Sequence, residues 1–130
     1  MIPNILILAL IIVESGGNPK AIGDNGLAYG CLQMHAAYVK DAAEYANADW
    51  EHNDAFDPVT SLQIIKAYMK RYANDDRLGR DATSEDVARI HNGGPNGYKK
   101  SATDAYWNKV KSKLIEFGRK DLAEGKPINI

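Results

Sequence analysis

Two carboxylates near the N-terminus, Glu14 and Asp24, have the residue types and the spacing for acid–base chemistry. Glu14 follows nine consecutive apolar residues, Ile5 to Val13. A carboxyl group at the mouth of an apolar helix is partly desolvated, which predicts a raised pKa for Glu14 and the role of a general acid. Asp24 lies in the turn-forming sequence Gly-Asp-Asn-Gly, a polar setting that keeps it ionised. One neutral and one ionised carboxyl group is the pair that glycoside hydrolysis requires, although an ordinary helix end and an ordinary turn also explain the pattern.

A second unusual stretch, His91 to Gly97, reads His-Asn-Gly-Gly-Pro-Asn-Gly. Its three glycines and one proline predict a loop that is neither helix nor strand. Such a loop lets the backbone approach a ligand and exposes N–H and C=O groups that suit N-acetylated sugars. The alternative is a helix stop followed by a tight turn, which needs only one or two glycines.

The bulk composition is that of an ordinary globular protein, and its 130 residues predict one domain, 1–130. The single cysteine, Cys31, permits no internal disulfide, and its apolar neighbours indicate a buried side chain and not a nucleophile. The three histidines have no metal-ligand spacing and no phosphate-binding loop occurs, so we expect neither a metal nor a cofactor.

Charge and hydropathy exclude two classes of partner. The first 60 residues carry eight acidic and two basic side chains, and the other 70 carry fourteen basic and nine acidic ones. Because aromatic residues are not interleaved with the basic ones, we expect no nucleic-acid binding. The apolar run from Ile5 to Val13 is too short to span a bilayer, so we expect no membrane partner.

The elements that must position these residues are mostly helices. After the first helix, glycines and Pro19 break the chain into turns around one or two short strands, with an extended segment from Leu27 to Met34. Asp57-Pro58 is a helix start, and Thr83 to Asp86 reads as a capping box. We expect helices over 4–15, 35–47, 58–72, 83–90 and from 103 or 104 onward, with loops at 49–57 and 77–80 and a loosely held tail at 125–130.

The chain as a whole resembles the invertebrate-type (i-type) lysozymes, the destabilase-like family. The match runs from about residue 10 to 112, and the Arg-Ile-His-Asn-Gly-Gly-Pro-Asn-Gly sequence is its most specific part. The segments that carry the resemblance are Glu14–Gly17, Gly30–Met34 with Tyr38 and Asp41, Tyr68–Tyr72, Ala88–Gly97, and Thr103 with Tyr106–Val110.

The resemblance implies a lysozyme-like α+β fold, mostly helical, with a small β element after the first helix. It implies a muramidase that cleaves the β-1,4 bond between N-acetylmuramic acid and N-acetylglucosamine, and our first hypothesis is that it does so by a retaining mechanism. Glu14 would be the acid and Asp24 its partner. Gln33 and Tyr38 either line a sugar groove or satisfy buried backbone groups. The candidate substrate-binding residues are Ser15, Gln33, Tyr38, His91, Asn92, Gly93 and Gly94.

Two departures from the family bear on where the protein acts. Animal members are rich in disulfides, whereas this chain has Tyr29 and Tyr98 where they place cysteine. This predicts a bacterial or phage member that folds without disulfides, whether secreted or cytoplasmic until lysis or injection. We expect a monomer whose partner is peptidoglycan or chitooligosaccharide. Some family members also cleave isopeptide bonds, for which His91 is a candidate participant with no matching serine.

Two other functions remain open at this point. Lytic transglycosylases also carry a Glu-Ser pair followed by Gly-x-x-Gln, and Glu14 alone would suffice for their chemistry. A cell-wall-binding module that has lost catalysis would keep the same fold. The presence of Asp24 and the match at His91 to Gly97 favour hydrolysis.

Overall fold

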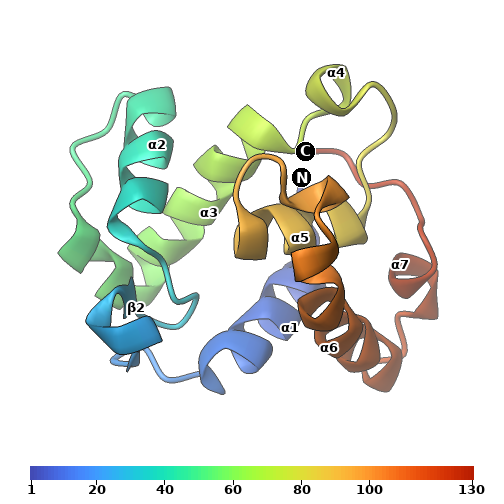
Figure 1. Cartoon of the computed structure of the whole chain (residues 1–130), viewed down its shortest axis with the longest axis horizontal. Helices are drawn as coiled ribbons and strands as arrows, with labels where there is room; N and C mark the ends of the chain where they lie inside the picture. The colour runs from blue at the N-terminus through green and yellow to red at the C-terminus, as the bar shows by residue number, and fades with distance from the viewer. The chain divides into compact units, whose positions relative to one another are not determined.

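The computed structural model describes residues 1–130 as two compact units. Unit 1 joins Met1–Leu10 to Tyr72–Ile130, and unit 2 consists of Ile11–Arg71. The helix α1 (Asn4–Ser15) begins in unit 1 and ends in unit 2. Most of the chain is helical, with one two-stranded sheet after α1 (Figure 1), so the predicted α+β class is confirmed. None of the helices combines the length and the hydropathy needed to cross a bilayer.

Helix α1 begins and ends where the sequence predicts. The carbonyl of Pro3 accepts a hydrogen bond from the Leu6 N–H at 3.0 Å, and Gly16 and Gly17 end the helix with φ values of 64° and 90°. Leu6 is fully buried, but Leu8 is 43% exposed. Although its residues are apolar throughout, α1 is therefore not buried on every side, because one face remains uncovered.

Unit 2 contains the sheet, a hairpin whose register places Ile22 opposite Tyr29. The extended segment predicted up to Met34 is wrong beyond Tyr29, because Gly30 and Gln33 turn the chain with φ values of 83° and 50°. Met34 then returns to pair with Tyr29 in an isolated bridge. The hairpin consists of β1 (Ile22–Gly23), the 3₁₀ turn η1 (Asp24–Gly26) and β2 (Ala28–Tyr29).

Two helices follow the hairpin (Figure 1): α2 (Ala36–Ala46) and α3 (Pro58–Tyr72). The predicted cap of α3 is confirmed, because the Asp57 carboxylate accepts from the Thr60 N–H at 2.9 Å. The segment predicted as a loop contains a short 3₁₀ helix, η2 (His52–Phe56), which is closed by a capping box at its start.

Unit 1 is built on α5 (Ser84–Gly93) and α6 (Asp104–Glu116). The predicted capping box of α5 is present, and Trp107, Val110 and Leu114 form the buried face of α6. Trp107 is 7% exposed and belongs to the core. The other elements of unit 1 are α4 (Asp75–Leu78), η3 (Gly97–Lys99), η4 (Ser101–Thr103) and α7 (Lys120–Ala123).

Two segments of unit 1 are more ordered than the sequence predicts. The predicted linker at 77–80 overlaps α4, whose first turn is capped by Asn74, which accepts from the Arg77 N–H at 2.9 Å. The tail predicted to be loose is held, because Ile128 is 7% exposed and its N–H donates to the Ala82 carbonyl at 2.8 Å. The cap of α4 is a local contact, whereas the tail is held by a residue 46 positions earlier in the chain.

Candidate functional site

The end of α1 carries Glu14, and its neighbour Ser15 fixes that end to the segment after the hairpin. The Ser15 hydroxyl donates to the Cys31 carbonyl at 2.8 Å and accepts from the Gly17 N–H at 3.2 Å. Glu14 is half-buried. Because Ser15 is anchored on both sides, the backbone of Glu14 has a fixed position within unit 2.

Asp24 lies at the first position of η1, at the tip of the hairpin. Asp24 and Asn25 both have left-handed backbone conformations, with φ values of 50° and 56°. Such values are uncommon outside glycine, and asparagine and aspartate tolerate them best. The Leu27 N–H closes the turn by donating to the Gly23 carbonyl at 3.1 Å. The turn therefore fixes the backbone of Asp24 at the tip of the hairpin.

The Asp24 carboxylate is paired with a residue that the sequence analysis did not select, His35. The distance from His35 Nε2 to Asp24 Oδ2 is 2.8 Å, and the two side chains are 48% and 59% exposed. No local sequence pattern predicts this pair, because it depends on the turns between β2 and α2. The carboxylate of Asp24 thus lies in a polar setting, exposed to solvent and bonded to one imidazole.

Gln33 satisfies buried backbone groups, the second of the two roles that the sequence left open for it. Its side-chain amide donates to the Ala21 carbonyl at 3.1 Å and to the Gly30 carbonyl at 2.9 Å. A methyl group added at Gly23 would overlap the Gln33 side chain, so the hairpin and this amide are closely packed. Gln33 therefore holds the base of the hairpin, and its contact with a sugar stays a prediction.

Tyr38 lies on α2 and is buried, with 9% of its surface exposed. Its ring stacks on the ring of Tyr68 from α3, with centroids 3.7 Å apart and planes 10° from parallel. Burial raises the pKa of Tyr38 well above its ordinary value, and the nearby Tyr68 and Glu14 raise this pKa further. Tyr38 is therefore a neutral phenol within electrostatic range of Glu14.

The stretch predicted to be irregular in unit 1 begins inside a helix. Helix α5 continues through His91 and Asn92 to Gly93, so the prediction that 91–97 contains no helix is wrong. The Lys100 ammonium donates to the Gly93 carbonyl at 2.9 Å, and the Gly94 N–H donates to the Ile90 carbonyl at 2.9 Å. These bonds complete the last turn of α5 and occupy backbone groups that were expected to face a ligand.

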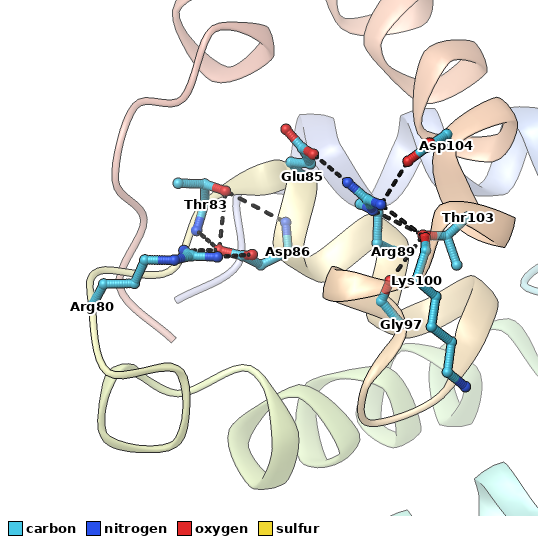
Figure 2. Close-up of polar contacts among 9 residues, drawn as sticks. All are labelled: Arg80, Thr83, Glu85, Asp86, Arg89, Gly97, Lys100, Thr103 and Asp104. Carbon is cyan, nitrogen blue, oxygen red and sulfur yellow. Dashed lines mark hydrogen bonds and ion pairs between the residues drawn. The ribbon is translucent and has the colours of Figure 1, made fainter.

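Figure 2 shows the side chains that fix the loop after α5. Arg89 is only 14% exposed and donates to Thr103 Oγ1 at 2.8 Å, to Asp104 at 2.6 Å and to Glu85 at 2.7 Å. Thr103 in turn donates from its hydroxyl to the Gly97 carbonyl at 2.8 Å. The loop is thus bonded to the start of α6 through one buried guanidinium.

Arg77 of α4 holds the other side of the same loop. Its guanidinium donates to the Pro95 carbonyl at 2.7 Å and to the Asn96 side chain at 2.9 Å. The same group lies 5.5 Å from the centre of the Tyr72 ring and 5.7 Å from that of Tyr98. These contacts are cation–π interactions of ordinary length. Within unit 1 the loop is therefore a rigid structure held from two sides.

The structure divides the predicted site residues between the two units. Glu14, Ser15, Asp24, Gln33 and Tyr38 lie in unit 2, and His91, Asn92, Gly93 and Gly94 lie in unit 1. Within unit 1, His91 is 8% exposed whereas Asn92 is exposed.

Metal and thiol chemistry have little support in the chain. Nowhere do three or more histidine, cysteine or acidic side chains gather in an arrangement that could hold a metal ion. Cys31 is 5% exposed, its Sγ lies 3.9 Å from the Ser61 hydroxyl, and burial raises its pKa. The predicted burial of Cys31 is confirmed, and a buried thiol with a raised pKa is a poor nucleophile.

The helix–hairpin–helix order is that of a lysozyme-like fold, and comparison with known proteins shows a glycoside hydrolase of the lysozyme class. The family model described as Destabilase matches residues 6–113. Lysozyme 1 of Crassostrea virginica is 36% identical over 102 residues, which cover 77% of this chain and 53% of that protein. The lysozyme of Ostrea edulis is 31% identical over 130 residues, covering 83% and 93% of the two chains.

Solved structures agree with the sequence comparison. The inhibitor-bound lysozyme from Meretrix lusoria matches with a TM-score of 0.73 and 29% identity over 85% of this chain and 89% of that one. The chain therefore belongs to the Destabilase family, the invertebrate-type lysozymes, and it is a cysteine-poor member. The family and the lysozyme-like fold inferred from sequence are both confirmed.

Proposed function

We propose that this protein is a muramidase that hydrolyses the β-1,4 bond between N-acetylmuramic acid and N-acetylglucosamine in peptidoglycan. The proposal rests on one observation: both carboxylates lie on connected backbone segments of unit 2. Glu14 is fixed through the bond from Ser15 to the Cys31 carbonyl, and the hairpin that carries Asp24 lies immediately before that segment. Both acids are therefore attached to one rigid piece of backbone.

In the proposed reaction Glu14 gives its proton to the glycosidic oxygen while the bond from that oxygen to C1 breaks. Asp24 attacks C1 from the opposite side and forms a glycosyl-enzyme ester. Water then displaces the ester, with Glu14 taking the proton from the water, and the sugar is released with its original configuration. Such a retaining mechanism requires carboxyl groups roughly 5–5.5 Å apart with the sugar bound.

The surroundings of the two acids support different roles. Glu14 is half-buried beside the buried phenol of Tyr38, whereas Asp24 is 59% exposed and hydrogen-bonded to an imidazole. The proposal therefore gives proton donation to the less exposed carboxyl group, Glu14, and attack on C1 to the more exposed one, Asp24.

The remaining predicted residues receive more limited roles in the proposal. In unit 2, Ser15, Gln33 and Tyr38 hold the two carboxylates in place, because their polar groups or rings are engaged with the protein. In unit 1 we assign sugar binding to the exposed Asn92, while His91, Gly93 and Gly94 shape the helix end that carries it. The exposed side-chain amide of Asn92 is the group best able to contact an N-acetyl substituent.

The proposal is tested first with Glu14→Gln, compared with Glu44→Gln as the matched control. Glu44 is an exposed residue of α2 that pairs only loosely with Arg71, at 3.4 Å. We expect Glu14→Gln to lower the release of reducing ends from purified peptidoglycan by at least ~10²-fold, because general acid catalysis is lost. Glu44→Gln should cleave at the wild-type rate. A Glu14→Gln variant as active as the control would refute the proposal.

The chemistry of the products separates the alternatives. Mass spectrometry of the digest should show reducing N-acetylmuramic acid ends, whereas 1,6-anhydro ends would identify a lytic transglycosylase that uses Glu14 alone. Binding to peptidoglycan without cleavage at any pH would identify a non-catalytic module. Proton NMR during cleavage of a chitooligosaccharide should show the β-anomer first if the mechanism is retaining.

A further inference from the structure

We propose that His35 is a positioning residue for the reaction: its imidazole holds the Asp24 carboxylate so that one oxygen faces the sugar carbon. This inference rests on the proposed role of Asp24. The two side chains form a hydrogen bond of 2.8 Å between His35 Nε2 and Asp24 Oδ2. It engages Oδ2 and leaves Oδ1 available for C1.

The chemistry of the His35–Asp24 pair determines which atom carries the proton. An ionised carboxylate can only accept hydrogen bonds, so His35 must carry a proton on Nε2 in this arrangement. His35 keeps that proton when Oδ1 bonds to C1, because the donated bond involves the other oxygen. The role is therefore to orient and polarise Asp24, not to transfer a proton.

The backbone on both sides of His35 is rigid enough for such a role. His35 is the N-cap residue of α2, with φ −80° and ψ 161°. The preceding residue, Met34, is 1% exposed and exchanges two backbone hydrogen bonds of 3.0 Å with Tyr29. Its carbonyl also accepts a bond of 2.8 Å from His52 Nε2. His35 therefore projects from a fixed point.

His52 is itself immobilised by aromatic packing. Its ring is stacked on Tyr29, with centroids 3.6 Å apart and planes 5° from parallel. Phe56 lies against the same tyrosine with a centroid distance of 4.6 Å. These contacts support the segment from which His35 projects, and they lie at the opposite end of the hairpin from Asp24.

Asp24 needs an external partner because its own backbone does not restrain its side chain. The turn places Asp24 and Asn25 in consecutive left-handed conformations, which are less favourable than ordinary ones. The carboxylate is 59% exposed and would otherwise sample several orientations. A charge-assisted hydrogen bond selects one of them before the substrate arrives.

The test uses an aryl β-chitooligosaccharide with a good leaving group, because its cleavage does not depend on a proton from Glu14. On this substrate His35→Ala should lower kcat about tenfold and change KM less than twofold. His35→Gln, whose amide can donate from nearly the same place, should recover activity to within about threefold of wild type. Melting temperatures of both variants, measured in parallel, should differ from wild type by no more than a few degrees.

Two further variants separate this inference from the proposed function. Asp24→Asn should be nearly inactive on the aryl substrate, whereas Glu14→Gln should still release the aryl group in the first step, as a burst of up to one equivalent per enzyme, because that step needs no proton from Glu14. If Asp24→Asn is inactive while His35→Ala is as active as wild type, or if Gln rescues nothing, the positioning role of His35 is overturned and Asp24 keeps its assignment. If Asp24→Asn is fully active, the assignment of Asp24 fails and the inference fails with it.

Discussion

The salt bridge at the start of α5 gives a prediction whose size can be worked out from the structure. The Asp86 carboxylate is 4% exposed and accepts two bonds from Arg80, at 2.6 and 2.7 Å. It also accepts from the Thr83 N–H at 2.9 Å, which completes the capping box. Replacing Asp86 with Asn keeps the size of the side chain, removes its charge and turns one acceptor into a donor that faces the Arg80 guanidinium.

The expected loss of stability is about 2–3 kcal/mol. Charged hydrogen bonds contribute roughly 1.5–3 kcal/mol and a helix cap about 1 kcal/mol. The Arg80 side chain is 50% exposed, so water recovers part of the loss. For a chain of 130 residues, this free energy corresponds to a melting temperature lower by roughly 7–11 °C.

The effect should depend on pH. Burial raises the pKa of Asp86, but the bonds from Arg80 and Thr83 outweigh burial, so the pKa lies below its ordinary value. A carboxyl group with a lowered folded-state pKa stabilises the protein above its unfolded pKa of roughly 3.9, and this stabilisation is lost as pH falls through the folded value. The difference between wild type and Asp86→Asn should therefore be constant above about pH 5 and shrink below about pH 4.

The assay is urea unfolding followed by circular dichroism at pH 7 and pH 3, with Asp121→Asn as the matched control. Asp121 also accepts two bonds from an arginine, Arg119, which lowers its pKa. Both side chains of that pair are well exposed, so water replaces the arginine and we expect no measurable change. The reasoning is refuted if Asp86→Asn matches the control at pH 7, or if its deficit is undiminished at pH 3.

Two other predictions concern close packing. Gly97→Ala should destabilise the protein by about 3 kcal/mol or more, because the added methyl group would overlap the Arg89 carbonyl. Ser112→Ala, on the exposed face of α6, is the control. Equal melting temperatures of the two variants would contradict the prediction. Cys31 is buried, and burial raises its pKa. A thiol reagent should therefore modify Cys31 promptly in denaturant, but in the native protein only as fast as the fold opens around it. Labelling of the native protein as fast as a free thiol would count against this burial.

Local signals predicted most of the helices. The Asp57-Pro58 start of α3 and the capping box at Thr83 depend on residues within four positions of each other, and both are present. Helix α5 extends beyond the predicted end because Lys100, seven residues on, satisfies the Gly93 carbonyl. Such a contact cannot be predicted from the spacing of apolar residues within the helix.

The candidate site was predicted only in part for the same reason. Glu14 and Asp24 stand out because of their immediate neighbours in the sequence, whereas His35 does not. His35 pairs with Asp24 because Gly30 and Gln33 reverse the chain between them. The left-handed conformations of these two residues cannot be predicted from a hydropathy pattern. The engagement of Gln33 with the hairpin is likewise a result of that reversal.

The two tyrosines that stand where animal relatives place cysteine have a consequence for refolding. Tyr29 stacks on His52, and Tyr98 lies against Arg77, so ring contacts occupy both positions. A covalent crosslink restricts the denatured chain, whereas a ring contact vanishes with the fold. Recovery from denaturant should therefore proceed without the slow thiol-exchange phase of a crosslinked relative, and at one rate whether or not a reductant is present.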